Sequence, residues 1–209
     1  MPRSERRAQL LNAARGVFVD KGYYAAAMDD IAERAGVSKP VLYQHFPGKL
    51  ELYLALLDES GGQLLARIHE ALLSTADNKQ RVTATVAAYF DFVGDPATAH
   101  RLLFESDLTN EPAVRDRIER FTNLCAQEIA QIISEDTALP LEESMLLAVG
   151  LVGNAQVSAR YWAETGGAIP RDVASDLVAT LAWRGIGGFP KRDPEEPPGE
   201  RDTGGSAPE

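Results

Sequence analysis

Residues 28–49 constrain the fold of this chain more than any other stretch. They read Met-Asp-Asp-Ile-Ala-Glu-Arg-Ala-Gly-Val-Ser-Lys-Pro-Val-Leu-Tyr-Gln-His-Phe-Pro-Gly-Lys, which predicts two short helices joined by a sharp Gly-Val-Ser turn. Gly36 can adopt the left-handed conformation that closes the first helix, and Ser38 is a good N-cap for the second. Pro40 is tolerated in the first turn of that second helix, and Pro47-Gly48 end it. We therefore expect a helical corner here.

Helical periodicity continues through nearly the whole chain, and no stretch alternates convincingly with period two. The expected helices are one that Ser4 caps and Gly22 ends, one at 28–35, the helix after Ser38, a long one from Lys49, and segments at about 79–93, 97–107, 111–135, 141–165 and 171–187. This pattern predicts an all-α fold of about nine helices. We expect a three-helix head over 1–48, a helical body over 49–189, and a disordered tail over 190–209, where Pro, Gly and charge dominate.

The helix after Ser38 has few residues to bury and many to display. Residues four apart share a column on a helix, and Leu42 with Phe46 form its one apolar column. The remaining columns are free to meet a major groove, where Val41 can touch a thymine methyl and polar side chains can reach base edges or phosphates. Lys39 and Gln44 suit base edges, whereas Tyr43, His45 and Lys49 suit phosphates. The predicted DNA contacts are Ser38, Lys39, Pro40, Val41, Tyr43, Gln44, His45 and Lys49.

Charge is distributed unevenly along the chain. The formal net charge is −10, yet residues 1–53 hold eight Lys or Arg against six Asp or Glu, which leaves +2 there and −12 on the remainder. A mildly basic head on an acidic body suggests DNA contact at one end, in an orientation-dependent and salt-dependent manner. The alternative is a helical corner that serves only to pack.

The segment from Ile31 through Tyr53 resembles the helix-turn-helix of the TetR family of transcriptional regulators. The matching elements are Ile31-Ala32, Ala35-Gly36-Val37-Ser38, Leu42-Tyr43, His45-Phe46 and Lys49, with Phe18, Lys21 and Gly22-Tyr23 before them. One departure concerns the second helix, where the family usually has a capping Thr that touches phosphate. Ala26-Ala27-Met28 supply no such side chain here, which puts one phosphate contact in doubt and removes a cap worth about 1 kcal/mol.

The last two predicted helices carry many small residues, which permit close approach between helices. The resemblance implies a homodimer, because this family dimerises through its last two helices, and twofold symmetry suits a reader of half-sites. The expected interface residues are Gly150, Gly153, Val157, Val173, Leu177 and Leu181. The alternative is that these stripes pack inside one subunit.

Apolar faces in the body are compatible with a chamber for a small apolar or amphipathic effector. The candidate pocket residues are Tyr89, Phe90, Phe104, Phe121, Cys125, Val149, Val152 and Gln156. Taken one by one, each is better explained by an ordinary filled core, so the ligand pocket is chiefly an implication of the resemblance. Gly61-Gly62 in the long helix is expected to be either a bending point or a site of close packing.

Other classes of function find little support in the sequence. The three histidines lack metal-ligand spacing, Cys125 is the single cysteine, and no catalytic pair converges, so we expect neither metal, cofactor nor enzyme activity. The N-terminus lacks the apolar segment of a secretory signal, and no run is long enough to cross a bilayer, so a cytoplasmic protein is expected. The sequence predicts a DNA-binding regulator, a repressor that a ligand releases from a palindromic operator. The rivals are a helical protein-interaction module and an enzyme with a helix-turn-helix-like head.

Overall fold

A computed structural model describes residues 2–95, 108, 111–137 and 139–185, and within these ranges it contains helices and no strand. The helices are α1 (Arg3–Ala25), α2 (Met28–Arg34), α3 (Lys39–His45), α4 (Lys49–Leu73), α5 (Asn78–Gly94), α7 (Pro112–Thr137), α8 (Leu141–Glu164) and α9 (Arg171–Arg184). The all-α prediction is confirmed, with eight helices in the described ranges where about nine were expected. The expected helix at 97–107 and the tail at 190–209 lie outside these ranges.

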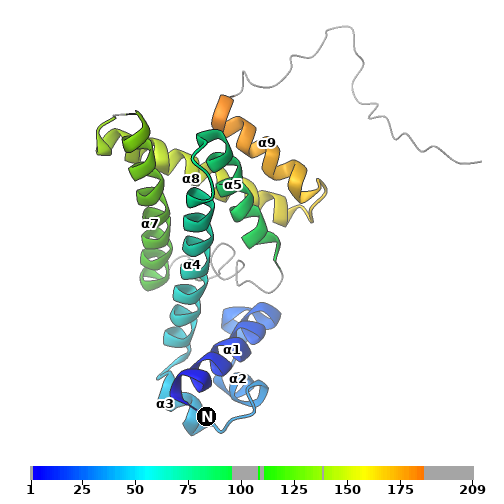
Figure 1. Cartoon of the computed structure of the whole chain (residues 1–209). Helices are drawn as coiled ribbons and strands as arrows, with labels where there is room; N and C mark the ends of the chain where they lie inside the picture. The colour runs from blue at the N-terminus through cyan, green and yellow to red at the C-terminus, as the bar shows by residue number, and fades with distance from the viewer. Residues whose placement is uncertain (1, 96–107, 109–110, 138, 186–209) are drawn as a thin grey trace, which may run out of the picture.

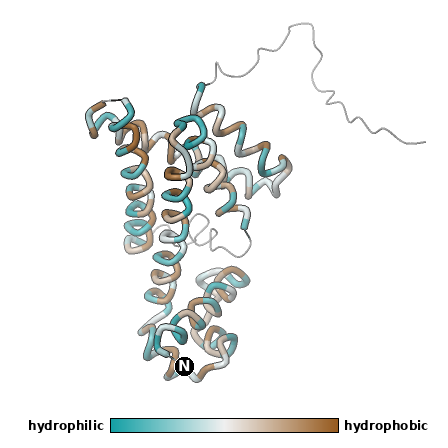
Figure 2. The backbone as a smooth tube through the Cα atoms, in the orientation of Figure 1, coloured by the Kyte–Doolittle hydropathy of each residue, from teal (hydrophilic) through white to brown (hydrophobic). Residues whose placement is uncertain are grey.

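Helix α4 connects the two ends of the molecule (Figure 1). Helices α1, α2 and α3 gather around its N-terminal turns to form the head, and α5 and α7 flank the rest of it in the body. Helix α8 packs on α7 and α5, and α9 packs on α5 and α8. Apolar residues line the surfaces where the helices meet, and polar residues cover much of the outside (Figure 2).

Helix α1 is interrupted where the sequence predicts its end. Gly22 has φ 75° and ψ 166°, a conformation that costs a residue with a Cβ far more than it costs glycine. One further helical turn follows before the chain enters α2. At the other end, the N-cap residue is Pro2 rather than the expected Ser4, because the chain is already helical from Arg3.

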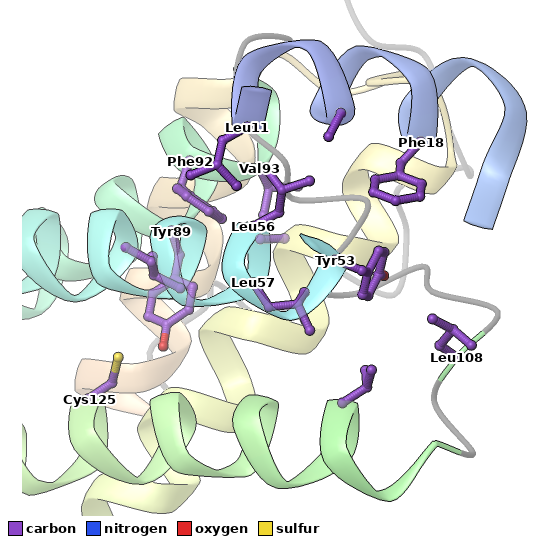
Figure 3. Packing of buried hydrophobic residues seen from close by; sticks show 14 of the residues in the cluster. Leu11, Phe18, Tyr53, Leu56, Leu57, Tyr89, Phe92, Val93, Leu108 and Cys125 are labelled. Atoms are coloured by element: carbon purple, nitrogen blue, oxygen red, sulfur yellow. The ribbon is translucent and has the colours of Figure 1, made fainter. Parts of the chain in front are cut away.

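The head and body share one continuous apolar core. Tyr53, from the second turn of α4, lies against the Phe18 ring at a centroid distance of 5.3 Å and near-perpendicular planes. Figure 3 shows Leu56 of α4 among Leu11 of α1 and Phe92 and Val93 of α5, where the two parts meet. The first turns of α4 therefore belong to the packing of the head.

Gly61 lies inside the uninterrupted helix α4 and is buried. A Cβ at this position would overlap the ring of Phe121 from α7, whereas a Cβ at Gly62 would meet nothing. Gly61 is therefore the close-packing point between α4 and α7, and α4 continues through it as an uninterrupted helix. No described helix is long and apolar enough to span a membrane.

Candidate nucleic-acid interface and body cavity

The turn between α2 and α3 is built from backbone hydrogen bonds and one left-handed glycine. Gly36 has φ 63°, and the Val37 N–H donates to the Ala32 carbonyl over 3.0 Å. The amide of Gln9 on α1 donates to the Ala35 carbonyl over 2.8 Å and ties the turn to α1. Because the turn is tied to α1, α3 is presented in a fixed orientation relative to α1.

Helix α2 begins without a side-chain cap at Ala27, as its sequence predicts. Asp30 compensates in part, since its carboxylate accepts from the Ala27 N–H over 3.1 Å and pairs with Lys21 over 2.8 Å. The hydrogen bond from Lys21, followed by that from Ala27, holds the pKa of Asp30 below its ordinary value. The carboxylate of Asp30 is thus used within the head.

Helix α3 buries one column and leaves the rest accessible. Leu42 and Phe46 are 0% and 3% exposed and pack into the head. The predicted contact residues Ser38, Lys39, Pro40, Tyr43 and Gln44 are exposed, and Val41 and His45 are partly exposed. The structure therefore places seven of the predicted residues at accessible positions on α3 or at its N-cap, while Leu42 and Phe46 face the core of the head.

Two lysines have partners that the sequence did not reveal. The ammonium of Lys39 pairs with Asp29 of α2 over 2.5 Å, so it must leave this partner before it can reach a base. The ammonium of Lys49 donates to the carbonyls of Tyr23 and Ala26 over 2.9 Å each and lies 4.4 Å from the Tyr23 ring centroid. Lys49 is thus directed into the head and satisfies carbonyls left free around the break at Gly22.

The body contains a cavity of about 500 Å³ between α5, α7, α8 and the ends of α4 and α9. This volume lies in the range typical of small-molecule sites. Its lining is largely aliphatic and aromatic, with few polar groups. The lining residues are Leu72, Asn78, Arg81, Val82, Thr85, Val86, Tyr89, Ile129, Ile132, Ile133, Asp136, Thr137, Leu147, Gly150, Leu151, Val152, Ala155, Ala182 and Trp183.

The few polar groups in this lining differ in whether they already have hydrogen-bond partners. Arg81 donates to Asp136 and Asn78 over 2.9 Å each, so an ion pair joins α5 to the end of α7 beside the cavity. The hydroxyl of Thr85 is buried and has no hydrogen-bond partner among the residues that the structure describes. An unpaired buried hydroxyl is costly, and a polar atom of a ligand would satisfy it. Thr85 was not predicted, because a lone threonine on an otherwise apolar helix face carries no signal of its own.

The predicted pocket residues are divided between several places. Tyr89 and Val152 line the cavity, and a separate void of about 20 Å³ is lined by Tyr89, Phe121, Cys125 and Gln156 among others. Phe90 packs against Trp162 at a centroid distance of 5.7 Å, outside both linings. Val149 is 43% exposed and also lies outside them. Phe104 is outside the described residues.

Tyr89 and Cys125 form a buried polar pair between the cavity and the small void. Figure 3 shows the Tyr89 hydroxyl directed at the Cys125 sulfur, and the two groups share a hydrogen bond. Burial raises the pKa of the Cys125 thiol to about 11, and burial likewise raises the pKa of Tyr89. Cys125 is therefore a protonated, unreactive thiol at neutral pH.

Helices α8 and α9 expose apolar side chains that nothing in the described chain covers. Leu146, Leu147, Val157 and Tyr161 of α8 are each at least half exposed. Among the predicted interface residues, Gly150, Val157, Val173 and Leu177 are exposed, and Gly153 and Leu181 are partly exposed. Gly150 also lines the cavity, so this surface and the cavity share part of α8. The described residues contain no group of acidic, His or Cys side chains able to hold a metal.

Comparison with known proteins relates this architecture to a family. The family model described as bacterial regulatory proteins, tetR family, matches residues 10–56. A protein of Mycolicibacterium smegmatis named HTH-type transcriptional activator FasR is 46% identical over 190 residues, which cover 91% of this chain and 87% of that protein. A TetR-like regulator structure from Rhodococcus sp. RHA1 aligns with a TM-score of 0.71 and 28% identity, over 90% of this chain and all of that one. The FadR regulator of Bacillus subtilis, solved in complex with stearoyl-CoA, shares the fold, with a TM-score of 0.69 and 22% identity over 86% of this chain and 98% of that one.

Proposed function

This chain belongs to the TetR family and is a transcriptional regulator, not an enzyme; we propose that it binds a palindromic operator as a homodimer and that a largely apolar ligand in the body cavity changes this binding. The observation that carries the proposal is helix α3. It buries one column on Leu42 and Phe46 and presents its other side chains beyond the surface of the head. A short helix in this arrangement fits the major groove.

A second copy of the chain is the occupant that we propose for the exposed apolar surface of α8 and α9. Exposed apolar area of this kind is uncommon unless it marks an interaction site. The small residues Gly150 and Gly153 would let two α8 helices approach closely. A twofold dimer would place two α3 helices for two half-sites, which a monomer cannot address together. Such a regulator acts on the chromosome, so we place it in the cytoplasm.

For the ligand we propose a molecule with a long apolar part and one polar end, such as a fatty acyl compound. The aliphatic lining of the 500 Å³ cavity supports the apolar part. The unpaired Thr85 hydroxyl and the Arg81–Asp136 pair supply sites for a polar or anionic group. Stearoyl-CoA, bound by the Bacillus subtilis FadR protein of the same fold, is the natural first probe.

The direction of regulation has two candidates. Repression, the prediction from the sequence, follows if the operator overlaps the promoter. Activation is favoured by the Mycolicibacterium smegmatis relative, which is named an activator. A promoter reporter, compared with and without the gene, distinguishes them by the sign of the change.

The proposed function is tested by measuring DNA affinity by fluorescence anisotropy, with duplexes from the region upstream of the gene that encodes this protein. We expect the protein to bind one of these duplexes as a dimer. Unlabelled duplex of the same sequence should compete for this binding, and a scrambled duplex of equal composition should not. Stearoyl-CoA should shift that affinity, and Thr85→Val should weaken the shift while leaving operator binding intact. Equal affinity for operator candidates and scrambled DNA would contradict sequence-specific regulation.

A further inference from the structure

The head holds eight lysines and arginines between residues 2 and 53, and most of them are already neutralised. Arg15, Lys21, Arg34 and Lys39 pair with Glu59, Asp30, Asp20 and Asp29 over 2.5–3.1 Å. Lys49 is occupied by backbone carbonyls. Within the described residues, the cations of this segment that bind no carboxylate and no carbonyl are Arg3, Arg6 and Arg7, at the start of α1.

These three arginines share one side of α1. Residues three and four apart on a helix are neighbours, so Arg6 and Arg7 both lie beside Arg3. Arg3 and Arg7 are exposed, and Arg6 is partly exposed. Their contacts are with neutral groups, since Arg6 donates to the Gln9 amide oxygen over 2.8 Å and the Arg7 guanidinium lies 5.1 Å from the Phe46 ring centroid. We call Arg3, Arg6 and Arg7 the arginine cluster.

The position of the arginine cluster relative to α3 is fixed by contacts. Phe46 follows the last residue of α3, so Arg7 lies at the end of the helix that we place in the groove. Two residues along α1, Gln9 binds the Ala35 carbonyl at the turn before α3. Figure 1 shows the N-terminus of the chain beside α3, at the end of the head farthest from the body. The arginine cluster and α3 therefore lie close together, at the end of the head farthest from the body.

The start of a helix is an unfavourable place for positive charge. The free N–H groups and the helix dipole there favour carboxylates. The first turns of α2 and α8 follow this rule with Asp29, Asp30, Glu142 and Glu143, whereas the first turns of α1 hold three arginines beside a single acid, Glu5. An anion brought to this end of α1 would relieve the repulsion among the arginines and interact favourably with the free N–H groups.

We infer that the arginine cluster binds backbone phosphates of the duplex that α3 reads and supplies the main electrostatic anchor of the head. This inference rests on the proposed DNA binding. Guanidinium groups suit phosphate because they donate in a planar, bidentate manner. The cluster precedes residue 10, where the match to the family model begins. It explains how a protein of net charge −10 can approach DNA in one orientation.

The test compares two double variants of the full-length protein by anisotropy, at several salt concentrations, on an upstream duplex and on a scrambled duplex. Arg3→Gln/Arg7→Gln removes two exposed charges of the arginine cluster. Lys79→Gln/Arg120→Gln removes the same charge from exposed positions on α5 and α7. Arg3→Lys/Arg7→Lys keeps the charge and changes the side chain, and circular dichroism verifies that each variant folds.

For the cluster variant we expect binding to both duplexes to weaken about tenfold or more at moderate salt. The slope of log K against log salt should fall by about 0.9 for each phosphate that the variant no longer neutralises. The body variant should retain the wild-type slope, and the lysine variant should retain most of it. A wild-type slope in Arg3→Gln/Arg7→Gln, with DNA still bound, would overturn this inference alone. Failure of the wild type to bind any duplex at low salt would overturn the proposed function and the inference with it.

Discussion

At the scale of single residues, Lys49 could either stabilise the fold or contact DNA, and a variant at this position distinguishes the two roles. Its ammonium binds two carbonyls over 2.9 Å and lies over Tyr23, which joins α4 to the end of α1. Lys49→Met leaves these partly buried acceptors unpaired, so we expect the free energy of unfolding to fall by about 1–3 kcal/mol. The salt slope of DNA binding should stay unchanged. Urea titration and anisotropy measure the two quantities, with Lys79→Met as the exposed control; unchanged stability with a slope lower by about 1 would instead assign Lys49 to a phosphate.

Cys125 gives a second prediction at this scale. Its thiol has a pKa of about 11 in the folded protein because it is buried, so between about pH 9 and 11 the unfolded chain ionises this group first. The native state then holds more protons, and the contribution of the neutral thiol to stability decreases as pH rises through this window, by at most roughly 1.4 kcal/mol per pH unit. The stability difference between wild type and Cys125→Ala should therefore shrink from pH 9 to 11.

Labelling with iodoacetamide provides an independent check on the same residue. At pH 8 the native protein should react no faster than it unfolds, whereas the chain in urea should react at the rate of an ordinary cysteine. Rapid labelling of the native protein would show that the thiol is accessible and that its proton is not held by burial.

At the scale of helices, two adjacent glycines in α4 make opposite predictions. Gly61→Ala places a methyl group against the Phe121 ring, so we expect a loss of about 1–3 kcal/mol as α4 and α7 are forced apart. Gly62→Ala meets nothing and removes the backbone entropy of a glycine within a helix, so it should gain about 0.5–1 kcal/mol. Denaturant midpoints of the two variants measure this difference, and equal effects would contradict the packing of Phe121 on Gly61.

The helix boundaries show what local sequence is able to predict. Gly22, Gly36 and Gly48 mark the interruption of α1, the turn before α3 and the start of α4, because each signal acts within a few residues. The partners of Lys39 and Lys49 were not predictable in this way. Lys49 meets carbonyls more than twenty residues away, and its position at a helix start equally suited a phosphate. Thr85 was also not predictable from local sequence, because its role as a proposed ligand contact depends on α7, α8 and α9, which are far from it in the sequence.

At the scale of the whole molecule, the described residues leave an apolar surface of α8 and α9 uncovered. The head and body share a core through α4, yet α8 and α9 present Val157 and Leu177 to solvent with 56% and 45% of their surface exposed. If a second copy covers them, a charge there must be desolvated on association. The double variant Val157→Arg/Leu177→Arg should therefore be a folded monomer at micromolar concentration by sedimentation velocity, where we expect the wild type to be a dimer.

The same variant should lose operator affinity while retaining non-specific DNA binding. Each monomer still carries α3 and the arginine cluster, so its salt-dependent attraction to any duplex remains, but two half-sites can no longer be bound together. Leu73→Arg is the matched control because Leu73 is 69% exposed and belongs to α4 rather than to α8 or α9, so it should leave both the dimer and operator binding intact. A dimer that survives Val157→Arg/Leu177→Arg with full operator affinity would require a different surface for assembly. The exposed faces of α8 and α9 would then need another occupant.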